Sequence, residues 1–133
     1  MSKTRIEKDS MGELAVPAEA LYAAQTQRAV DNFPVSGQPM PAPFIRALLL
    51  AKRAAATANS ELEQIPAELA EAICGAVDEL LATDFMPHFP VDVFQTGSGT
   101  SSNMNANEVL ATLAARRYGQ PVSANDHINC GQS

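Results

Sequence analysis

The sequence predicts a mainly α-helical domain of about four to five helices, with a short β-hairpin at its N-terminal end. Three observations support this fold class. The 133 residues fit one domain. Hydrophobic residues make up 46% of the chain and aromatic residues only 5%, and alanine and leucine, both strong helix formers, supply most of the apolar content. Apolar residues in the central part recur at spacings of three and four, the period of an amphipathic helix.

The N-terminal region is expected to form a hairpin and then a helix. Residues 5–16 alternate weakly in polarity around the turn-like tetrad Ser10-Met11-Gly12-Glu13. Pro17 is predicted to open a helix that runs to Val30, because proline is tolerated in a first helical turn. Residues 34–43 contain four prolines and are expected to form a loop.

Two central helices follow from apolar periodicity. Residues 44–62 predict the clearest helix, with one apolar stripe toward the core: Phe44, Leu48, Ala51, Ala55, Ala58 and Leu62. A third helix is expected after Pro66, and its predicted core stripe consists of Leu69, Ile73, Val77 and Leu80.

A fourth helix is expected from Ser102 or Asn103 to about Tyr118, after a loop at 84–90 and a short extended piece at 91–94. Gly119 is predicted to stop it, since glycine is favoured just beyond a helix C-terminus. Val109, Leu110, Leu113 and Arg117 are predicted to share one face of this helix, and Asn105 with Glu108 is interpreted as a capping pair near its start.

Charge and cysteine usage exclude several classes of function. The net charge is −6 and the nine basic residues are scattered, which argues against nucleic acid and an anionic membrane as partners. No apolar run approaches the roughly 18 residues that span a bilayer. Cys74 and Cys130 have neither a disulfide framework nor metal-ligand spacing. We therefore expect a cytoplasmic chain that binds no metal and no cofactor.

The segment 94–107 carries the most informative chemistry. It is rich in serine, threonine and asparagine, has no charged residue, and leads into the fourth predicted helix. Gly97 and Gly99 permit tight turns, and a helix start offers free N–H donors that favour anions. This pattern predicts a pocket for a small anion such as a carboxylate. The alternative is an ordinary helix cap and loop. A nucleotide loop is disfavoured because neither a third glycine nor a Gly-Lys-Ser/Thr run follows.

Four ordered stretches resemble class II fumarases. The segment 95–109, Gln-Thr-Gly-Ser-Gly-Thr-Ser-Ser-Asn-Met-Asn-Ala-Asn-Glu-Val, is similar to the family signature. Residues 5–12 look like the family's opening, and 22–28 resembles its Tyr-Gly-Ala-Gln-Thr-Gln-Arg segment, with Ala23 in place of glycine. Residues 125–133 resemble the start of an Asn-Asp-x-Val-Asn-x-x-Gln-Ser-Ser-Asn-Asp block. The resemblance implies that residues 1–133 are the N-terminal helical domain of a longer chain.

The resemblance also implies a reaction, the reversible hydration of fumarate to (S)-malate, without a cofactor. Positions that match family residues binding the substrate carboxylate are Ser98, Gly99 through its backbone, Thr100 and Ser133. A second carboxylate site in the family aligns with Ser123, Ala124, Asn125 and Asp126, where Ser123 replaces the family's histidine.

The same family assembles each active site from three subunits of a homotetramer, and its catalytic histidine and serine lie beyond residue 133. No catalytic residue is therefore expected within these residues. The chain by itself is expected to be inactive, to bind dicarboxylates weakly if at all, and not to form a tetramer.

Five other features are given structural roles. His127 occupies a position that is usually Asp in the family, so it is not expected to be catalytic. His88 is predicted to be a surface loop residue, and Cys130 a tolerated substitution in its block. Cys74 lies beside an apolar stripe and is expected to pack in the core. No chemical role is assigned to the motif 25–28, for which a structural role is expected.

Two rival interpretations stay open. One is another enzyme of the same superfamily, such as aspartase, which releases ammonia instead of water; the segments 95–100 and 25–28 favour a fumarase over it. The other is a helical interaction module without enzymatic activity, whose partner would cover an exposed apolar surface.

Overall fold

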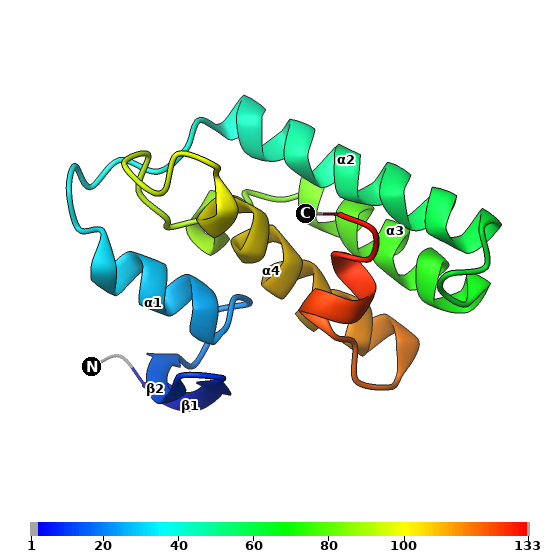
Figure 1. Cartoon of the computed structure of the whole chain (residues 1–133), viewed down its shortest axis with the longest axis horizontal. Helices are drawn as coiled ribbons and strands as arrows, with labels where there is room; N and C mark the ends of the chain where they lie inside the picture. The colour runs from blue at the N-terminus through cyan, green and yellow to red at the C-terminus, as the bar shows by residue number, and fades with distance from the viewer. Residues whose placement is uncertain (1–2, 133) are drawn as a thin grey trace.

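The computed structural model describes residues 3–132. Ser133, one of the predicted carboxylate-binding residues, lies outside them. The described elements, in chain order, are β1 (Thr4–Asp9), β2 (Gly12–Pro17), α1 (Ala24–Asn32), α2 (Ala42–Glu61), α3 (Ala67–Leu81), η1 (Met86–His88), α4 (Thr100–Tyr118) and η2 (Ala124–Ile128). The predicted class, mainly α with an N-terminal hairpin, is confirmed. Figure 1 shows α2 and α3 side by side, α4 packed under α3, and the hairpin with α1 at the other side of α4.

The hairpin is antiparallel and is tied to α1 by an ion pair. Its register runs from Thr4 opposite Pro17 to Asp9 opposite Gly12. The guanidinium of Arg28 donates to both carboxylate oxygens of Asp9, at 2.7 and 2.9 Å. This contact lowers the pKa of Asp9 below its usual value. It fixes the tip of the hairpin beside α1.

The predicted start of the first helix is wrong. Pro17 does not open a helix but closes β2, where it pairs with Thr4. The helix α1 begins only at Ala24, and it has no side-chain cap from its own N-terminal flank. A cap does exist, but it comes from a residue far along the chain, so local sequence gave no sign of the true start.

The residue that caps α1 is Glu108 of α4. The sequence had instead predicted that Glu108 and Asn105 cap α4 itself. Glu108 and Asn105 both lie buried inside α4 and neither caps it. The Glu108 carboxylate instead accepts hydrogen bonds from three backbone amides at the start of α1, those of Ala23 (3.1 Å), Gln25 (3.0 Å) and Thr26 (2.9 Å). The Thr26 hydroxyl donates a fourth, at 2.6 Å. A negative charge at a helix start is favourable, so one carboxylate joins α1 to α4.

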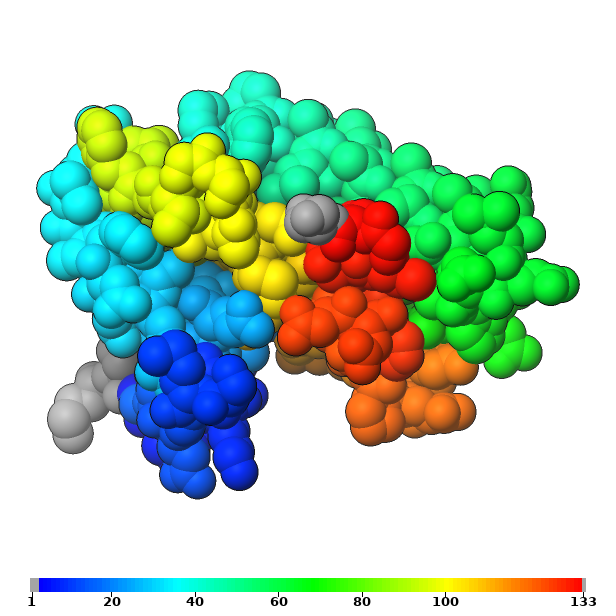
Figure 2. Space-filling view, viewed as in Figure 1, coloured from blue at the N-terminus to red at the C-terminus, as the bar shows by residue number. Residues whose placement is uncertain are grey.

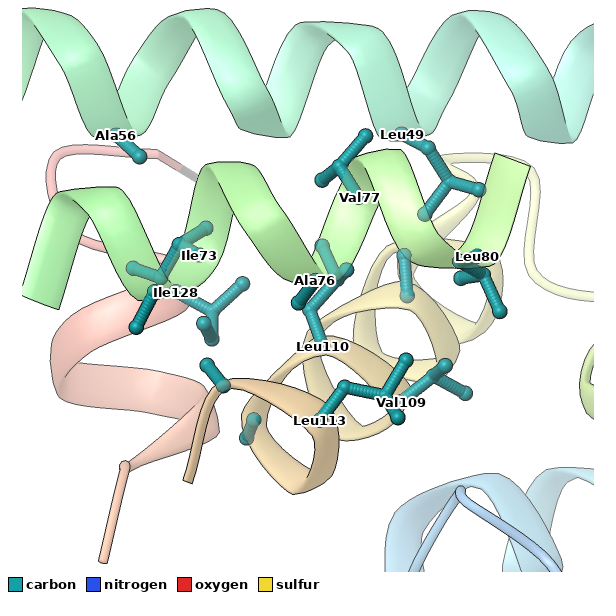
Figure 3. Packing of buried hydrophobic residues seen from close by; sticks show 14 of the residues in the cluster. Leu49, Ala56, Ile73, Ala76, Val77, Leu80, Val109, Leu110, Leu113 and Ile128 are labelled. Atoms are coloured by element: carbon teal, nitrogen blue, oxygen red, sulfur yellow. The ribbon is translucent and has the colours of Figure 1, made fainter. Parts of the chain in front are cut away.

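The core forms where α2, α3 and α4 meet. Figure 3 shows large aliphatic side chains of α3 between those of α2 above and α4 below. The predicted stripe of α3 is confirmed, because all of its members are buried: Leu69, Ile73, Val77 and Leu80. On α4 the apolar members of the predicted face, Val109, Leu110 and Leu113, are buried. Arg117, placed on the same face, is exposed and pairs with Glu79 instead.

The predicted stripe of α2 is wrong by one residue. The buried side chains of α2 are Ile45, Leu49, Lys52 and Ala56. By contrast Phe44 is 43% exposed and Leu62 68% exposed. Alanine occurs on every side of this helix, so the same spacing fits more than one face. The large residues Ile45 and Leu49 decide which face packs, because they bury more apolar area than alanine.

A buried carboxylate holds the proline-rich loop in place. Asp92 is 6% exposed and accepts hydrogen bonds from the amides of Ser36, Gly37 and Phe94, each at 2.8 Å. The Ser36 hydroxyl also donates to it, at 2.9 Å. These hydrogen bonds, led by that of Phe94, lower the pKa of Asp92 to about 2. The loop is thereby fixed next to the segment that leads to α4.

Replacing Asp92 with asparagine is expected to reduce stability in a pH-dependent way. The folded-state pKa of about 2 lies below the usual 3.8. The carboxylate therefore stabilises the fold above pH 3.8, and this contribution is lost as the pH falls through about 2. The difference in urea midpoint between the wild type and Asp92→Asn should be largest at neutral pH and should decrease as the pH falls toward about 2. Asp84→Asn, an exposed matched control, should show little difference at either pH. An Asp92→Asn difference that does not change with pH would contradict this account.

No helix within residues 3–132 has the length and apolar character needed to cross a membrane.

Candidate functional site

The loop before α4 brings three of the predicted site residues together. Gly99 has φ of 74°, a left-handed conformation that glycine adopts without strain, and α4 begins directly after it. Ser98 Oγ and Thr100 Oγ1 share a hydrogen bond of 2.8 Å, and both residues are exposed. The two hydroxyls thus form a pair on the surface at the open end of the helix. The helix starts about two residues earlier than the sequence predicted, which includes Thr100 in its first turn.

Gln95 fixes this loop against the helix. Its Oε1 accepts from the amide of Ser102 at 3.0 Å, and its Nε2 donates to the Ser102 hydroxyl at 2.9 Å. The Nε2 group also donates to the carbonyl of Asp92 at 3.0 Å. Gln95 therefore caps the third amide of α4. Within residues 3–132, no hydrogen bond satisfies the two amides before it, those of Thr100 and Ser101.

The arrangement can bind an anion with neutral donors. The free amides at the start of α4 carry a positive partial charge. The hydroxyls of Ser98 and Thr100 stand beside them, and either can donate or accept. A surface hollow that includes Ser101 adjoins this point and is walled by the hairpin tip and α1 through Ser10, Gln25 and other residues. A small carboxylate fits this chemistry.

Residues 129–132, the C-terminal segment, lie against the first turns of α4. Figure 2 shows the red atoms of this segment beside the golden atoms of α4. The Asn103 side-chain amide donates to Asn129 Oδ1 at 3.1 Å. Gln132 Nε2 donates to the carbonyls of Ile128 and Cys130, at 2.9 and 3.2 Å. The chain is therefore folded tightly just before Ser133, the predicted site residue outside the described range.

A buried lysine of α2 holds the same segment, and the sequence reasoning missed it. Lys52 is 2% exposed, and its Nζ donates to Asn129 Oδ1 at 3.2 Å and to Gln132 Oε1 at 2.8 Å. Burial lowers the pKa of Lys52 to about 8. The signal that could have found it is its position, because Lys52 falls on the same helical face as Leu49 and Ala56.

The predicted second site forms a helical turn of its own. Ser123 caps η2, since its hydroxyl accepts from the amide of Asp126 at 3.0 Å, and its own amide donates to His127 Nδ1 at 2.9 Å. Asn125 and Asp126 are exposed, and Ala124 is half-buried. Figure 1 places η2 beside the later turns of α4, away from the loop that carries Ser98. Within residues 3–132, the structure thus keeps residues 123–126 apart from Ser98, Gly99 and Thr100.

The residues that received structural roles have defined contacts. His127 supports the turn through its bond with Ser123. The His88 carbonyl accepts from Asn105 at 2.9 Å, and burial lowers the pKa of the His88 imidazole. Cys74 and Cys130 are half-buried free thiols. Within the described residues, no cluster of His, Cys, Asp or Glu is arranged to hold a metal.

The motif 25–28, for which a structural role was expected, makes two kinds of contact. The backbone amides of Gln25 and Thr26 donate hydrogen bonds to the Glu108 carboxylate, which caps α1. Arg28 pairs with Asp9 of the hairpin. The motif therefore orients α1 and the hairpin against α4.

Comparisons with known proteins identify the relatives of this chain. The sequence profile of a family described as lyase matches residues 12–133. A curated relative from Pseudomonas aeruginosa, named fumarate hydratase class II 2, is 72% identical over the whole chain, which covers 29% of that protein. Fumarate hydratase class II from Xylella fastidiosa is 57% identical over 97% of the chain and is covered to 27%.

Two solved structures share the fold. Class II fumarase from Schistosoma mansoni superposes with a TM-score of 0.92 at 39% identity, over 98% of this chain and 29% of that one. A fumarate lyase:delta crystallin from Brucella melitensis gives 0.87 at 45% identity, over 98% of this chain and 32% of that one. The chain spans less than a third of the length of these proteins. It belongs to the lyase family and, within it, groups with the N-terminal part of the class II fumarate hydratases, as its motifs predicted.

Proposed function

We propose that this chain is the N-terminal, substrate-binding part of a fumarate hydratase. The enzyme would add water reversibly across the double bond of fumarate to give (S)-malate. The observation that carries the proposal is the hydroxyl pair of Ser98 and Thr100 at the open start of α4. The free amides beside this pair carry a positive partial charge that faces outward. The amides and the two hydroxyls together suit one carboxylate of a dicarboxylate substrate.

The chemistry assigns these donors a defined task. In the dehydration of malate, a base removes a proton from C3 and the electron pair moves onto the adjacent carboxylate. The hydroxyl then leaves C2 as water, with a proton from an acid. Donors fixed in place before the reaction stabilise the charge as it develops. Ser98, Thr100 and the Gly99 backbone serve this purpose in the proposal, together with Ser133. The base and acid come from later segments of the longer chain.

A second carboxylate site is proposed at residues 123–126, with weaker binding. The Ser123 hydroxyl is already engaged as the cap of η2. The exposed carboxylate of Asp126 repels an anion. Backbone amides and the Asn125 side chain are the groups left to bind it.

The longer protein is proposed to be a cytoplasmic homotetramer of the tricarboxylic acid cycle. Support comes from the family resemblance and from an acidic chain with two free thiols, which suit a reducing compartment. The 133-residue chain by itself is expected to be inactive and not to tetramerise. Light scattering of the purified chain measures its oligomeric state, and a stable tetramer would contradict the second expectation.

A fusion protein tests the proposed function. Residues 1–133 replace the matched 29% of the Pseudomonas aeruginosa relative, whose remaining sequence supplies the later segments. We expect the fusion to hydrate fumarate, measured by the loss of its ultraviolet absorbance, and to release no ammonia from aspartate. A folded fusion that leaves fumarate unchanged would contradict the proposal, and ammonia release would favour the aspartase alternative.

A further inference from the structure

Lys52 is a buried cation whose partners are neutral. Its ammonium donates to the side-chain oxygens of Asn129 and Gln132, and the residue is 2% exposed. The ion pairs found within residues 3–132 use other cations, and no carboxylate there lies within 4.0 Å of Lys52 Nζ. Lysine is rarely buried unless a carboxylate pairs with it, because removing a charge from water is costly.

Burial without a carboxylate does not help this fold. The lowered pKa, about 8, shows that the folded environment disfavours the charged form relative to water. At neutral pH the group nevertheless keeps its proton. An apolar side chain on the core face of α2 would pack there without that cost. A charged group kept at a position where it lowers stability is typical of functional sites.

The partners of Lys52 lead directly to the candidate carboxylate site. Asn129 Oδ1, which accepts from Lys52, also accepts from Asn103. Asn103 lies one turn after Thr100 on α4, so the two share a helical face. Gln132 immediately precedes the predicted site residue Ser133. Lys52 is therefore linked through Asn129 and Asn103 to the helix that begins at Thr100, and directly to Gln132, the residue that precedes Ser133 in the sequence.

The site itself lacks a cation. Residues 94–107 contain no charged side chain, yet the proposed substrate carries two negative charges. Amide oxygens orient the ammonium without neutralising it, so its positive charge remains available to an anion across a weakly polarisable interior. A carboxylate partner in the same place would cancel that charge.

We propose that Lys52 is the positioning residue that supplies positive charge to the carboxylate site and holds its C-terminal segment through Asn129 and Gln132. This inference rests on the proposed function. It predicts that the charge of Lys52 strengthens substrate binding in the ground state and the transition state alike. Its loss should therefore raise KM and leave kcat nearly unchanged.

Kinetics of the fusion protein test the inference. Lys52→Met removes the charge with similar side-chain length, and Gln132→Glu keeps the lysine but places a carboxylate against it. Both variants are expected to raise KM for malate by about tenfold, with kcat within about twofold of the wild type. Lys8→Met, on the exposed face of β1, is the matched control and should leave KM unchanged.

The outcomes separate the two proposals. An inactive wild-type fusion contradicts the proposed function itself. An active wild type with unchanged KM in Gln132→Glu overturns the role of the charge, even if Lys52→Met is impaired, because a merely structural lysine would tolerate a carboxylate partner. If Lys52→Met does not fold, as judged by circular dichroism, Gln132→Glu decides alone.

Discussion

Replacing Glu108 with alanine is expected to destabilise the chain by about 3 kcal/mol or more, because it leaves buried donors without an acceptor. Glu108 is 8% exposed, and its carboxylate accepts four hydrogen bonds from the start of α1. Alanine would leave the amide of Thr26 and its hydroxyl buried without this acceptor. Each unsatisfied buried donor costs about 1–3 kcal/mol. Urea unfolding followed by circular dichroism measures the change.

Two variants make this measurement specific. Glu108→Gln retains one acceptor oxygen but not the negative charge, so its loss of stability should be intermediate. Glu71→Ala removes an exposed glutamate from α3 and should change stability little. If Glu108→Ala costs no more than Glu71→Ala, then the cap does not join α1 to α4 as described.

Replacing Thr100 with alanine is expected to reduce kcat/KM of the fusion protein by about a hundredfold, since a preorganised donor to developing negative charge contributes on this order. The Thr100 hydroxyl lies 2.8 Å from that of Ser98, so its removal also frees Ser98 to rotate. Steady-state kinetics with malate measure the effect.

Thr100→Ser is the matched control for this substitution. It keeps the hydroxyl and loses only a methyl group, so most of the activity should return. Thr57→Ala removes an exposed threonine of α2 and should leave the kinetics unchanged. Unchanged kinetics in Thr100→Ala would remove the basis for assigning a substrate contact to this residue.

Parts of the fold could be predicted because large aliphatic side chains mark one face. On α3 the stripe from Leu69 to Leu80 consists of bulky residues, and all of them are buried. On α2 the predicted stripe relied on alanines, which occur on every face, and the true face was one residue away. Apolar spacing identifies a helix more reliably than it identifies the buried face when the side chains are small.

The candidate site could be predicted only where its groups are close in sequence. The glycines and hydroxyls around Ser98 and Thr100 form one short segment, and the structure does place these two side chains together. Glu108 and Lys52 could not be assigned in this way. Glu108 contacts residues more than 80 positions away, and Lys52 contacts Asn129, 77 positions away. Such partners appear only when tertiary packing brings the segments together.

The most direct test of the carboxylate site is a crystal structure of the fusion protein with malate bound. The account predicts one substrate carboxylate within hydrogen-bond distance of Ser98 Oγ, Thr100 Oγ1 and the first amides of α4. A substrate that binds with both carboxylates away from this helix start would contradict it.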